Sequence, residues 1–595
     1  MSKAYAEPKK IEFYPLKHQI LLRKDVGGKV LRLPEDTLEP EEVSEDQIAF
    51  DSNSYNIAFK VDAIYGIMKL VNDSYFIVVE KSERVAEILG KKIYRALEFR
   101  FIPIKRTMAG GKDKPHAGGS QDRKDQKFVD MFLRLLNKGI FYFSDEYNLT
   151  SALQTLVDVR FDINCCDSKF FINRFHLKKF IESNVNYFEF ISPFIIGFVT
   201  QDRVEIEKTD QTLLFTLISR KDTSRLGARF YSRGADIAGN VSNFVESEQI
   251  LDFVENRPRS VDKGAGDYAN YFDNKIISFM QVRGSIPLIW SQPPTLKYVP
   301  SMHIGEDVGK SEKAYKLHFQ KLMLKYDRIQ VVNLIDKVKS QYVLGKAFAN
   351  MHEKVSEASN EQYKDKVDFV WFDYHHECRG MKMENLHKLM DVIKDNLTAF
   401  QCFECNYFDA RGTGERHAKP RYEFKVLKHQ KGVIRTNCID NLDRTNVVQS
   451  VIARWMFLTI LKDKNIIPGF NNLFTSLPGR LEQSFRDAWT DNADALSIQY
   501  SGTPALKTDF TRTGKRGIKG ACWDGYNSAK RYFLNHFLDY EVQNTYDFLV
   551  ANISVKNYQF YEPNKGIIIR CRILKTAFLA HYNASPSQSI LLRIP

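Results

Sequence analysis

The sequence lacks the apolar segments that carry a protein into or across a membrane. The N-terminal stretch MSKAYAEPKKIEFYPLK has no apolar core, so we expect no signal peptide. The longest uncharged stretch near the other end, residues 576–592, is interrupted by His581, Asn583 and further polar residues. A spanning helix needs ~20 mainly apolar residues. We therefore expect no transmembrane span, and residues 533–595 are interpreted as a C-terminal tail without one.

Cysteine is scarce and irregularly spaced. The eight cysteines form no repeating framework, which in a chain of 595 residues favours a reducing compartment over a secreted fold held by disulfides. Cys402 and Cys405 form a lone C-x-x-C with no second pair to complete a zinc site. His375, His376 and Glu377 lack the H-E-x-x-H spacing and are interpreted as a structural cluster at a strand end. The sequence therefore predicts no metal and no cofactor.

Negative charge is in deficit. The 86 Lys and Arg residues outnumber the 73 Asp and Glu residues and give a formal net charge of +13, which favours an anionic partner. Charge alone fits nucleic acid and an anionic membrane equally well, but no nucleic-acid-binding motif is present. We therefore expect anionic membrane lipids as partners and no nucleic acid.

The most informative segment is VIRTNCIDNLDRTN, residues 433–446, in which five residues separate Cys438 from Arg444. An apolar strand leads into it, and the apolar residues from Val447 to Met456 recur on one helical face. A loop held between strand and helix can wrap its N–H groups around a phosphate while the helix N-terminus adds positive potential. We expect the helix to begin around Thr445 or Asn446, whose side chains can cap it.

The residue types in this loop are those of a cysteine-dependent phosphatase. A helix N-terminus and a nearby arginine favour the Cys438 thiolate, which is the nucleophilic form. The planar fork of Arg444 can hold two phosphoryl oxygens. Asp440 is the nearest candidate general acid and base, and Thr445 can donate a hydrogen bond to the sulfur. Asp443 can fix the loop through its backbone amides.

Two alternatives to these assignments are open. Asp491 and Asp494 sit three apart, on one face of an expected helix, and either is an alternative general acid on a mobile loop. A second C-x-x-x-x-x-R match runs from Cys405 to Arg411, but Gly412, Gly414 and Pro420 follow where a helix would be required. We interpret that second match as a decoy.

The motif resembles the signature R-T-N-C-x-D-C-L-D-R-T-N of the Sac-domain (suppressor-of-actin) phosphoinositide phosphatases. The matching residues are Arg435, Thr436, Asn437, Cys438, Asp440, Leu442, Asp443, Arg444, Thr445 and Asn446. The family usually has a second cysteine where this chain has Asn441, so a neighbouring thiol that protects the nucleophile is missing here.

The resemblance extends from about residue 55 to about residue 531. The segments that carry it are residues 64–80, 228–250, 281–290, 371–379 and 489–516. In order and length the chain looks most like the stand-alone, membrane-anchored members that remove the 4-phosphate of phosphatidylinositol 4-phosphate. The resemblance implies a cytosolic site on endoplasmic reticulum or Golgi membranes, reached here peripherally.

The same resemblance implies which residues hold the substrate. Its loop positions map onto Asn437, Ile439, Asn441, Leu442 and Asp443. A polyanionic head group also needs several cations around it. The basic run Lys507, Arg512, Lys515 and Arg516 is expected to supply them.

Length and pattern predict more than one domain. Residues 1–200 are interpreted as a β-rich N-terminal Sac subdomain, with a hairpin of residues 64–70 and 75–79 and a further strand at 141–143. Residues 201–532 are interpreted as an α/β catalytic domain with a cysteine-phosphatase phosphate loop. Strands 212–217 and 369–372 and helices 383–396 and 447–461 are expected in it. Residues 105–127, rich in Gly, Lys and Asp, are expected to form a mobile surface loop.

These features together predict a phosphoinositide phosphatase with a two-step, metal-independent mechanism. Cys438 attacks phosphorus, Arg444 and the loop amides hold the transferring group, and water hydrolyses the cysteinyl-phosphate. The alternative is a weakly active or inactive phosphoinositide-binding adaptor that uses the same pocket. A protein-tyrosine phosphatase fits less well, because nothing in the sequence suggests a phosphotyrosine slot.

Overall fold

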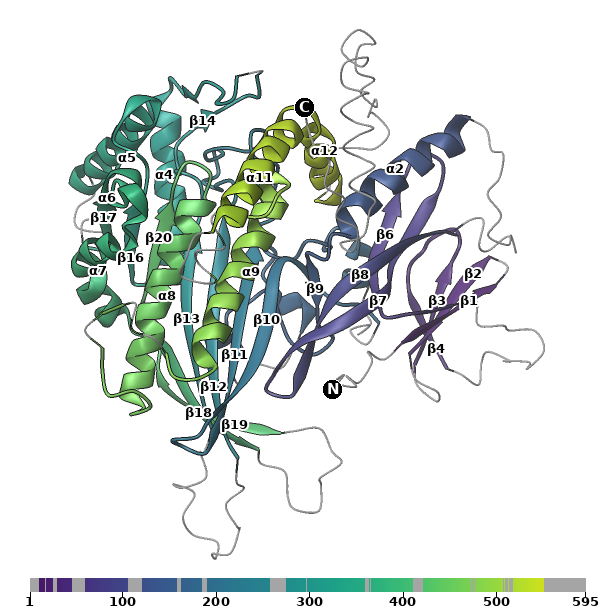
Figure 1. Cartoon of the computed structure of the whole chain (residues 1–595). Coiled ribbons are helices and arrows are strands. Elements are labelled where there is room, and N and C mark those ends of the chain that lie inside the picture. The colour runs from purple at the N-terminus through teal and green to yellow at the C-terminus, as the bar shows by residue number, and fades with distance from the viewer. Residues whose placement is uncertain are drawn as a thin grey trace, which may run out of the picture. The chain divides into compact units, whose positions relative to one another are not determined.

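A computed structural model gives the fold of most of the chain (Figure 1). It describes residues 10–550 except 17, 25–28, 45–58, 105–119, 158–161, 184–189, 257–273, 296, 359–362, 364, 410–420, 471, 474, 476, 507, 509–511 and 513–516. The predicted tail, residues 533–595, lies outside this description from residue 551 onward. No helix in the described part of the chain is long and apolar enough to cross a bilayer.

Thirteen strands form the main sheet, whose principal order is β17-β16-β20-β13-β12-β11-β10-β9-β8-β7-β6, with β18 paired to β13 and β19 to β18. Their bounds are β6 (Ala63–Lys69), β7 (Ser74–Ile88), β8 (Lys91–Pro103), β9 (Phe141–Phe143), β10 (Phe194–Ile206), β11 (Gln211–Lys221), β12 (Val245–Glu255), β13 (Asn274–Arg283), β16 (Arg328–Asn333), β17 (Val367–Trp371), β18 (Phe403–Asp409), β19 (Tyr422–Lys428) and β20 (Gly432–Asn437).

The parallel part of this sheet lies around β20. β16 pairs in parallel with both β17 and β20, and β20 pairs in parallel with β13, whereas the other named pairs of the sheet are antiparallel. All six residues of β20 are buried, as expected for a parallel strand that is covered on both faces. The loop that follows β20 therefore leaves the sheet from its best-packed strand.

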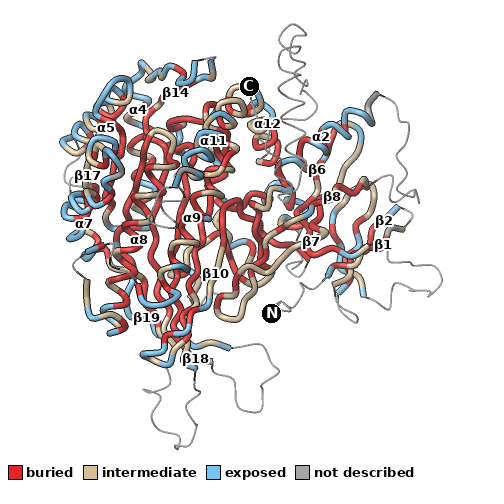
Figure 2. Tube along the Cα trace, in the orientation of Figure 1, coloured by how far each residue is buried: buried red, intermediate tan, exposed pale blue. Residues whose placement is uncertain are grey.

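Helices cover both faces of the sheet around β20. The helices are α2 (Ser120–Leu136), α3 (Lys178–Ile181), α4 (Val308–Met323), α5 (Lys339–Ala358), α6 (Tyr374–Glu377), α7 (Leu386–Phe400), α8 (Asp443–Asp463), α9 (Leu481–Ser501), α11 (Ile518–Phe537) and α12 (Asp539–Leu549), and the 3-10 turns are η2 (Leu153–Thr155), η3 (Ile163–Cys165), η5 (Arg379–Met381) and η6 (Met383–Asn385). Apolar side chains of α7, α8 and α9 belong to one buried cluster, and those of α4 and α5 belong to another. The strands between them are almost wholly buried (Figure 2).

Smaller sheets complete the structure. β1 (Ile11–Leu16), β2 (Gln19–Arg23), β3 (Val30–Pro34), β4 (Glu41–Val43) and β5 (Phe59–Val61) form a five-stranded sheet, and β14 (Trp290–Ser291) pairs with β15 (His303–Ile304). The five-stranded sheet packs on β6, β7 and β8 through one apolar cluster that includes Phe13, Leu31 and Phe76. The strand-rich character expected of the first part is present.

The structure confirms the hairpin of β6 and β7, the strand β9, the strands β11 and β17 and the helices α7 and α8 that the sequence predicts. The loop expected at residues 105–127 is wrong in its last part, because α2 begins at Ser120. Residues 105–119 lie outside the described residues. The helix forms because Phe128 and Phe132 are buried and Asp125 accepts hydrogen bonds from the N–H groups of Val71, Asn72 and Asp73 in the hairpin turn.

Position 200, where the sequence places a domain boundary, lies inside β10. This strand pairs with β9 on one side and with β11 on the other, so one sheet runs through both predicted domains. The boundary does not coincide with a break in the sheet, and the division into functional domains stays a prediction.

The close approach of β10 and β11 depends on a glycine. A Cβ atom built on Gly197 would lie 1.9 Å from the backbone oxygen of Ser219. Gly197→Ala should therefore lower the free energy of unfolding by on the order of 1–3 kcal/mol, because backbone has to shift to make room. Urea unfolding measures the change. Gly525→Ala is the control, since the same atom there meets nothing within 4 Å. Equal stability of the two variants would contradict this packing.

Candidate active site

Cys438 stands directly after β20 and before α8, at the carboxyl end of a parallel strand. Loops at that end, between neighbouring strands, form the usual ligand sites of α/β sheets. The pairing of β20 with β16 continues one residue beyond β16, because Leu334 N–H donates a hydrogen bond to the carbonyl oxygen of Asn437 at 2.8 Å. The local sequence thus produces the strand, loop and helix that the motif predicts.

Asn441 fixes the turn of the loop. Its φ is +52°, in the left-handed region that asparagine tolerates better than most side chains. Its side-chain oxygen accepts a hydrogen bond from Cys438 N–H at 3.2 Å. The residue that departs from the Sac signature therefore has a structural role in this loop.

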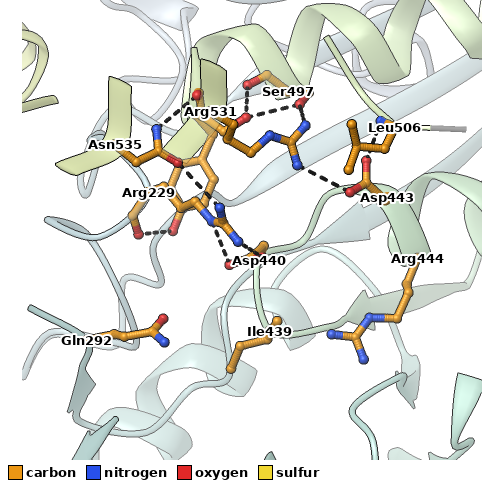
Figure 3. Close-up of polar contacts among 12 residues, drawn as sticks. Arg229, Gln292, Ile439, Asp440, Asp443, Arg444, Ser497, Leu506, Arg531 and Asn535 are labelled. Carbon is orange, nitrogen blue, oxygen red and sulfur yellow. Dashed lines mark hydrogen bonds and ion pairs between the residues drawn. The ribbon is translucent and has the colours of Figure 1, made fainter. Parts of the chain in front are cut away.

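The helix begins slightly earlier than the sequence suggests. α8 starts at Asp443, and Leu442 precedes it without a side-chain capping bond, so the predicted cap by Thr445 or Asn446 is wrong. Asp443 instead accepts hydrogen bonds from Leu506 N–H at 2.8 Å and from the Arg531 guanidinium at 3.3 Å (Figure 3). It ties the start of α8 to the segment after α9 and to α11, not to the amides of the loop itself.

Arg444 is oriented by residues from the segment that follows the neighbouring strand β16 and from α5. Its guanidinium donates to the Leu334 carbonyl at 3.1 Å, to Asp336 at 2.8 Å and to Gln341 at 3.1 Å. Burial works against the charge, but the neighbouring Cys438, Asp336 and Asp440 outweigh it and raise the pKa of Arg444. The cation therefore stays charged, with Cys438 among the groups that stabilise it.

Asp336 links Arg444 to the histidine cluster. Nδ1 of His375 lies 2.9 Å from the Asp336 carboxylate, which also binds Arg444. His375 belongs to α6, which follows β17, so the cluster stands at a strand end beside the site. Among the described residues, no three His, Cys, Asp or Glu side chains gather as they would to hold a metal ion.

Asp440 lies between two arginines from the segment that follows β11. Arg229 donates to its carboxylate at 2.6 and 3.2 Å, and Arg233 donates at 2.5 Å. Burial alone would raise the pKa of Asp440, but the two guanidinium groups outweigh burial and hold it well below its usual range. In this arrangement Asp440 is ionised at neutral pH and accepts hydrogen bonds.

Both arginines are themselves held in place. Arg229 also donates to Asn535 of α11 at 3.4 Å (Figure 3), and Arg233 donates to Gln292 at 2.9 Å and to the Ile439 carbonyl at 3.0 Å. Both arginines lie in residues 228–250, one of the segments that resemble the family, but no role was predicted for them. The only sequence feature that marks them is their spacing of four residues in RFYSR, which does not indicate a pairing with the distant Asp440.

Arg283 adds a fourth arginine beside the loop, after Arg444, Arg229 and Arg233. It is fully buried at the end of β13 and donates to Asn446 and to the Asn441 carbonyl, the latter at 3.5 Å. Burial lowers the pKa of Arg283 to about 9, and the nearby Cys438 acts in the opposite direction. Sequence reasoning missed this residue, because only the parallel pairing of β13 with β20 brings it to the loop.

A cavity of about 250 Å³ opens beside the loop. Its walls are formed by Arg229, Phe230, Gln292, Tyr298, Val299, Met302, Ser340, Gln341, Ile439, Asp440 and Arg444. Three predicted site residues, Ile439, Asp440 and Arg444, therefore share the cavity. Cys438 does not line it and is only 2 % exposed.

The other predicted site residues that the structure describes do not line the cavity. Asn437 donates to Asn333 at 2.7 Å, while Leu442 and Thr445 are buried. Arg512 forms ion pairs with Asp487 at 2.9 Å and Asp491 at 2.6 Å. Lys507, Lys515 and Arg516 fall outside the described residues.

Asp491 and Asp494 lie on α9, so the mobile loop expected for them is wrong. A helix forms here because its inner face, which includes Trp489 and Leu496, is buried. Asp494 accepts a hydrogen bond from Ala505 N–H at 2.9 Å, and burial raises the pKa of its carboxyl group to about 6. It does not line the cavity.

Comparisons with known proteins agree with the motif. The SacI homology domain matches residues 62–379, which end before Cys438. The phosphatidylinositol-3-phosphatase SAC1-A of Danio rerio is 33 % identical over 84 % of this chain and 77 % of its own length. The phosphatidylinositol-3-phosphatase SAC1 of Saccharomyces cerevisiae is 32 % identical over 83 % and 72 %, respectively. The phosphoinositide phosphatase SAC6 of Arabidopsis thaliana is 32 % identical over 86 % and 78 %.

The ion pairs of Asp440 predict a pH-dependent contribution to stability. The pKa of Asp440 in the folded protein lies below the unfolded value of about 3.9. The ion pairs therefore contribute fully to stability above the unfolded pKa, and this contribution is lost as the pH falls from there through the folded pKa. The gap in free energy of unfolding between the wild type and Asp440→Asn should be largest at neutral pH and should narrow below about pH 4. Urea unfolding across this range measures it.

Asp391→Asn is the control, because Asp391 pairs with Lys394 on the surface, where its side chain is 61 % exposed. That variant should differ little from the wild type at any pH. A gap for Asp440→Asn that stays constant with pH would contradict the ion pairs.

Proposed function

This chain belongs to the SacI homology domain family of phosphoinositide phosphatases, and on that premise we propose that it hydrolyses phosphatidylinositol monophosphates through a cysteinyl-phosphate intermediate. The single observation that supports the proposal best is the cavity in which Arg444 meets Ile439 and Asp440, the two residues that follow Cys438 in the loop. A pocket for binding alone needs the cation and the amides but no nucleophile beneath them.

In the first step the Cys438 thiolate attacks phosphorus. The S–P bond forms while the bond from phosphorus to the inositol oxygen breaks, and the departing oxygen takes a proton. In the second step water attacks phosphorus, the S–P bond breaks, and inorganic phosphate leaves the restored thiolate. Arg444 and the loop amides stabilise the phosphoryl oxygens in both steps. Because Cys438 is buried and does not line the cavity, the loop has to open for the attack.

Asp440 is the carboxylic acid among the cavity-lining residues and is our candidate for the proton transfers. While it pairs with two arginines it has no proton to give. Arg229 also lines the cavity, so an incoming phosphoryl group competes with Asp440 for it. Loss of one arginine lets the pKa of Asp440 rise toward the range in which it acts as an acid.

The substrate we propose is phosphatidylinositol 4-phosphate, from the resemblance to the stand-alone members of the family. The names of the Danio rerio and Saccharomyces cerevisiae relatives specify phosphatidylinositol 3-phosphate, so the two monophosphates have to be compared side by side. The proposed site of action is the cytosolic face of endoplasmic reticulum or Golgi membranes, with peripheral attachment. Co-localisation with compartment markers tests that placement.

The first test removes the nucleophile. Cys438→Ser should abolish phosphate release from short-chain phosphatidylinositol monophosphates and leave binding of the same lipids largely intact, because it changes little of the anion cradle. Arg444→Lys should also lose most activity, since lysine keeps the charge but not the planar fork.

Cys165→Ser, at an exposed cysteine, is the matched control and should keep full activity. Binding without turnover in the wild type would favour the alternative of a phosphoinositide-binding adaptor. Preferential release of phosphate from phosphopeptides would instead indicate a protein-tyrosine phosphatase.

The second test separates the two candidate acids. If Asp440 protonates the leaving group, Asp440→Asn should depress the rate strongly for an inositol lipid and far less for an activated aryl phosphate, whose leaving group needs no proton. Asp494→Asn, measured on the same two substrates, should lose little on either. The reverse pattern, with selective loss in Asp494→Asn, would move the role to Asp494 and leave Asp440 as an anchor of the loop.

A further inference from the structure

The mouth of the active-site cavity carries large apolar side chains that are exposed. Tyr298 and Val299, between β14 and β15, are 68 % and 64 % exposed. Val338 and Val343, at the start of α5, are each 57 % exposed. Single exposed apolar residues need no explanation, but a group of them beside one opening indicates an interaction site.

Both segments belong to the walls of the cavity. Tyr298 and Val299 line it directly. Ser340 and Gln341 line it from α5, and Val338 and Val343 flank these two residues in the chain. Figure 1 shows β14 and α5 at the same end of the sheet. We refer to residues 297–299 and 337–343 together as the rim.

The rim is held by specific contacts. Tyr298 stacks on Tyr532 of α11 with ring centroids 5.9 Å apart, and His536 of the same helix bonds the Lys297 carbonyl at 3.1 Å. On the other side Tyr342 stacks on Trp371 at 5.9 Å. These contacts hold both segments of the rim in place while their apolar side chains remain exposed to solvent.

Lysines are interleaved with the apolar residues of the rim. Lys297 precedes Tyr298, and Lys337 and Lys339 stand on either side of Val338, all of them exposed. Apolar side chains that enter the head-group layer, next to cations that attract anionic lipids, are the combination by which a protein lies on a membrane surface. The charge and the apolar area thus favour a bilayer with negative charge over a neutral partner.

We propose that the rim is the membrane-docking surface of this enzyme, with Tyr298, Val299, Val338 and Val343 in the interfacial layer of an anionic bilayer and the lysines at its phosphates. The inference rests on the proposed function and adds to it how the substrate is reached. An inositol lipid has to enter the cavity while its acyl chains stay in the bilayer, so the cavity mouth has to lie against the lipid surface.

The experiment compares two pairs of substitutions in the full chain. Val338→Ser with Val343→Ser removes apolar area from the rim without changing a residue that lines the cavity. Leu324→Ser with Val392→Ser is the matched control, since these side chains are 87 % and 60 % exposed, at the end of α4 and on α7. Sedimentation with phosphatidylcholine–phosphatidylserine vesicles measures binding, and phosphate release is measured from vesicle-embedded and from soluble short-chain phosphatidylinositol 4-phosphate.

The rim pair should bind vesicles several-fold more weakly and hydrolyse vesicle-embedded substrate correspondingly more slowly, with an unchanged rate on the soluble substrate. The control pair should match the wild type in all three assays. Lys337→Gln with Lys339→Gln should weaken binding by roughly five-fold per lysine and flatten its dependence on salt.

Vesicle binding by the rim pair at the level of the wild type, or equal losses in the control pair, would overturn the proposal. A loss of activity on the soluble substrate in the rim pair would overturn it too, because that result indicates damage to the site. Failure of the proposed function itself is distinguishable: the wild type would then release no phosphate from the soluble lipid, whatever the rim does at vesicles.

Discussion

The ion pairs between Asp440 and the two arginines are the interaction on which the geometry of the site depends. They connect the loop after β20 to the segment after β11, and through Arg229 and Arg233 to α11 and to Gln292 beside β14. Removing one partner of a buried pair leaves the other charge without compensation, which is strongly destabilising. The conformation of the loop therefore depends on the ion pairs of Asp440 with Arg229 and Arg233.

The surroundings of the loop hold more positive charge than negative. Arg283 of β13 and Lys221 of β11 both pair with Val245 of β12, which lies between them, and no described acidic side chain forms an ion pair with either. The ammonium of Lys221 faces the ring of Tyr500 at 5.2 Å, and burial, together with Arg283, lowers its pKa to about 7. A region with this excess favours an anionic group in the adjoining cavity. The lysines of the rim likewise favour anionic groups at the surface.

The sequence predicted the parts of the site that are local in the chain. Cys438, the loop and α8 follow one another within the motif. An apolar run was enough for β20, and two strand-like runs on either side of turn residues were enough for the hairpin of β6 and β7. Asp336, Arg229, Arg233 and Arg283 could not be predicted in the same way, because their roles come from pairing between segments far apart. The same limit applies to α2: its polar composition suggested a loop, and only contacts of Asp125 with the hairpin turn explain why a helix begins there.

Separation along the chain has a further consequence for the order in which the site is made. Arg229 and Arg233 precede their carboxylate by 211 and 207 residues. At a translation rate of about 5–20 residues per second, the ribosome adds that much chain in roughly 10–40 s. During this interval Asp440 and β20 have not yet been synthesised, so the arginines lack their carboxylate and β13 lacks its parallel neighbour. The two guanidinium groups therefore stay in water instead of being buried. The ion pairs of the site therefore cannot form until Asp440 has been synthesised, and a chain that stops short of Asp440 has two arginines without the charge that allows them to be buried.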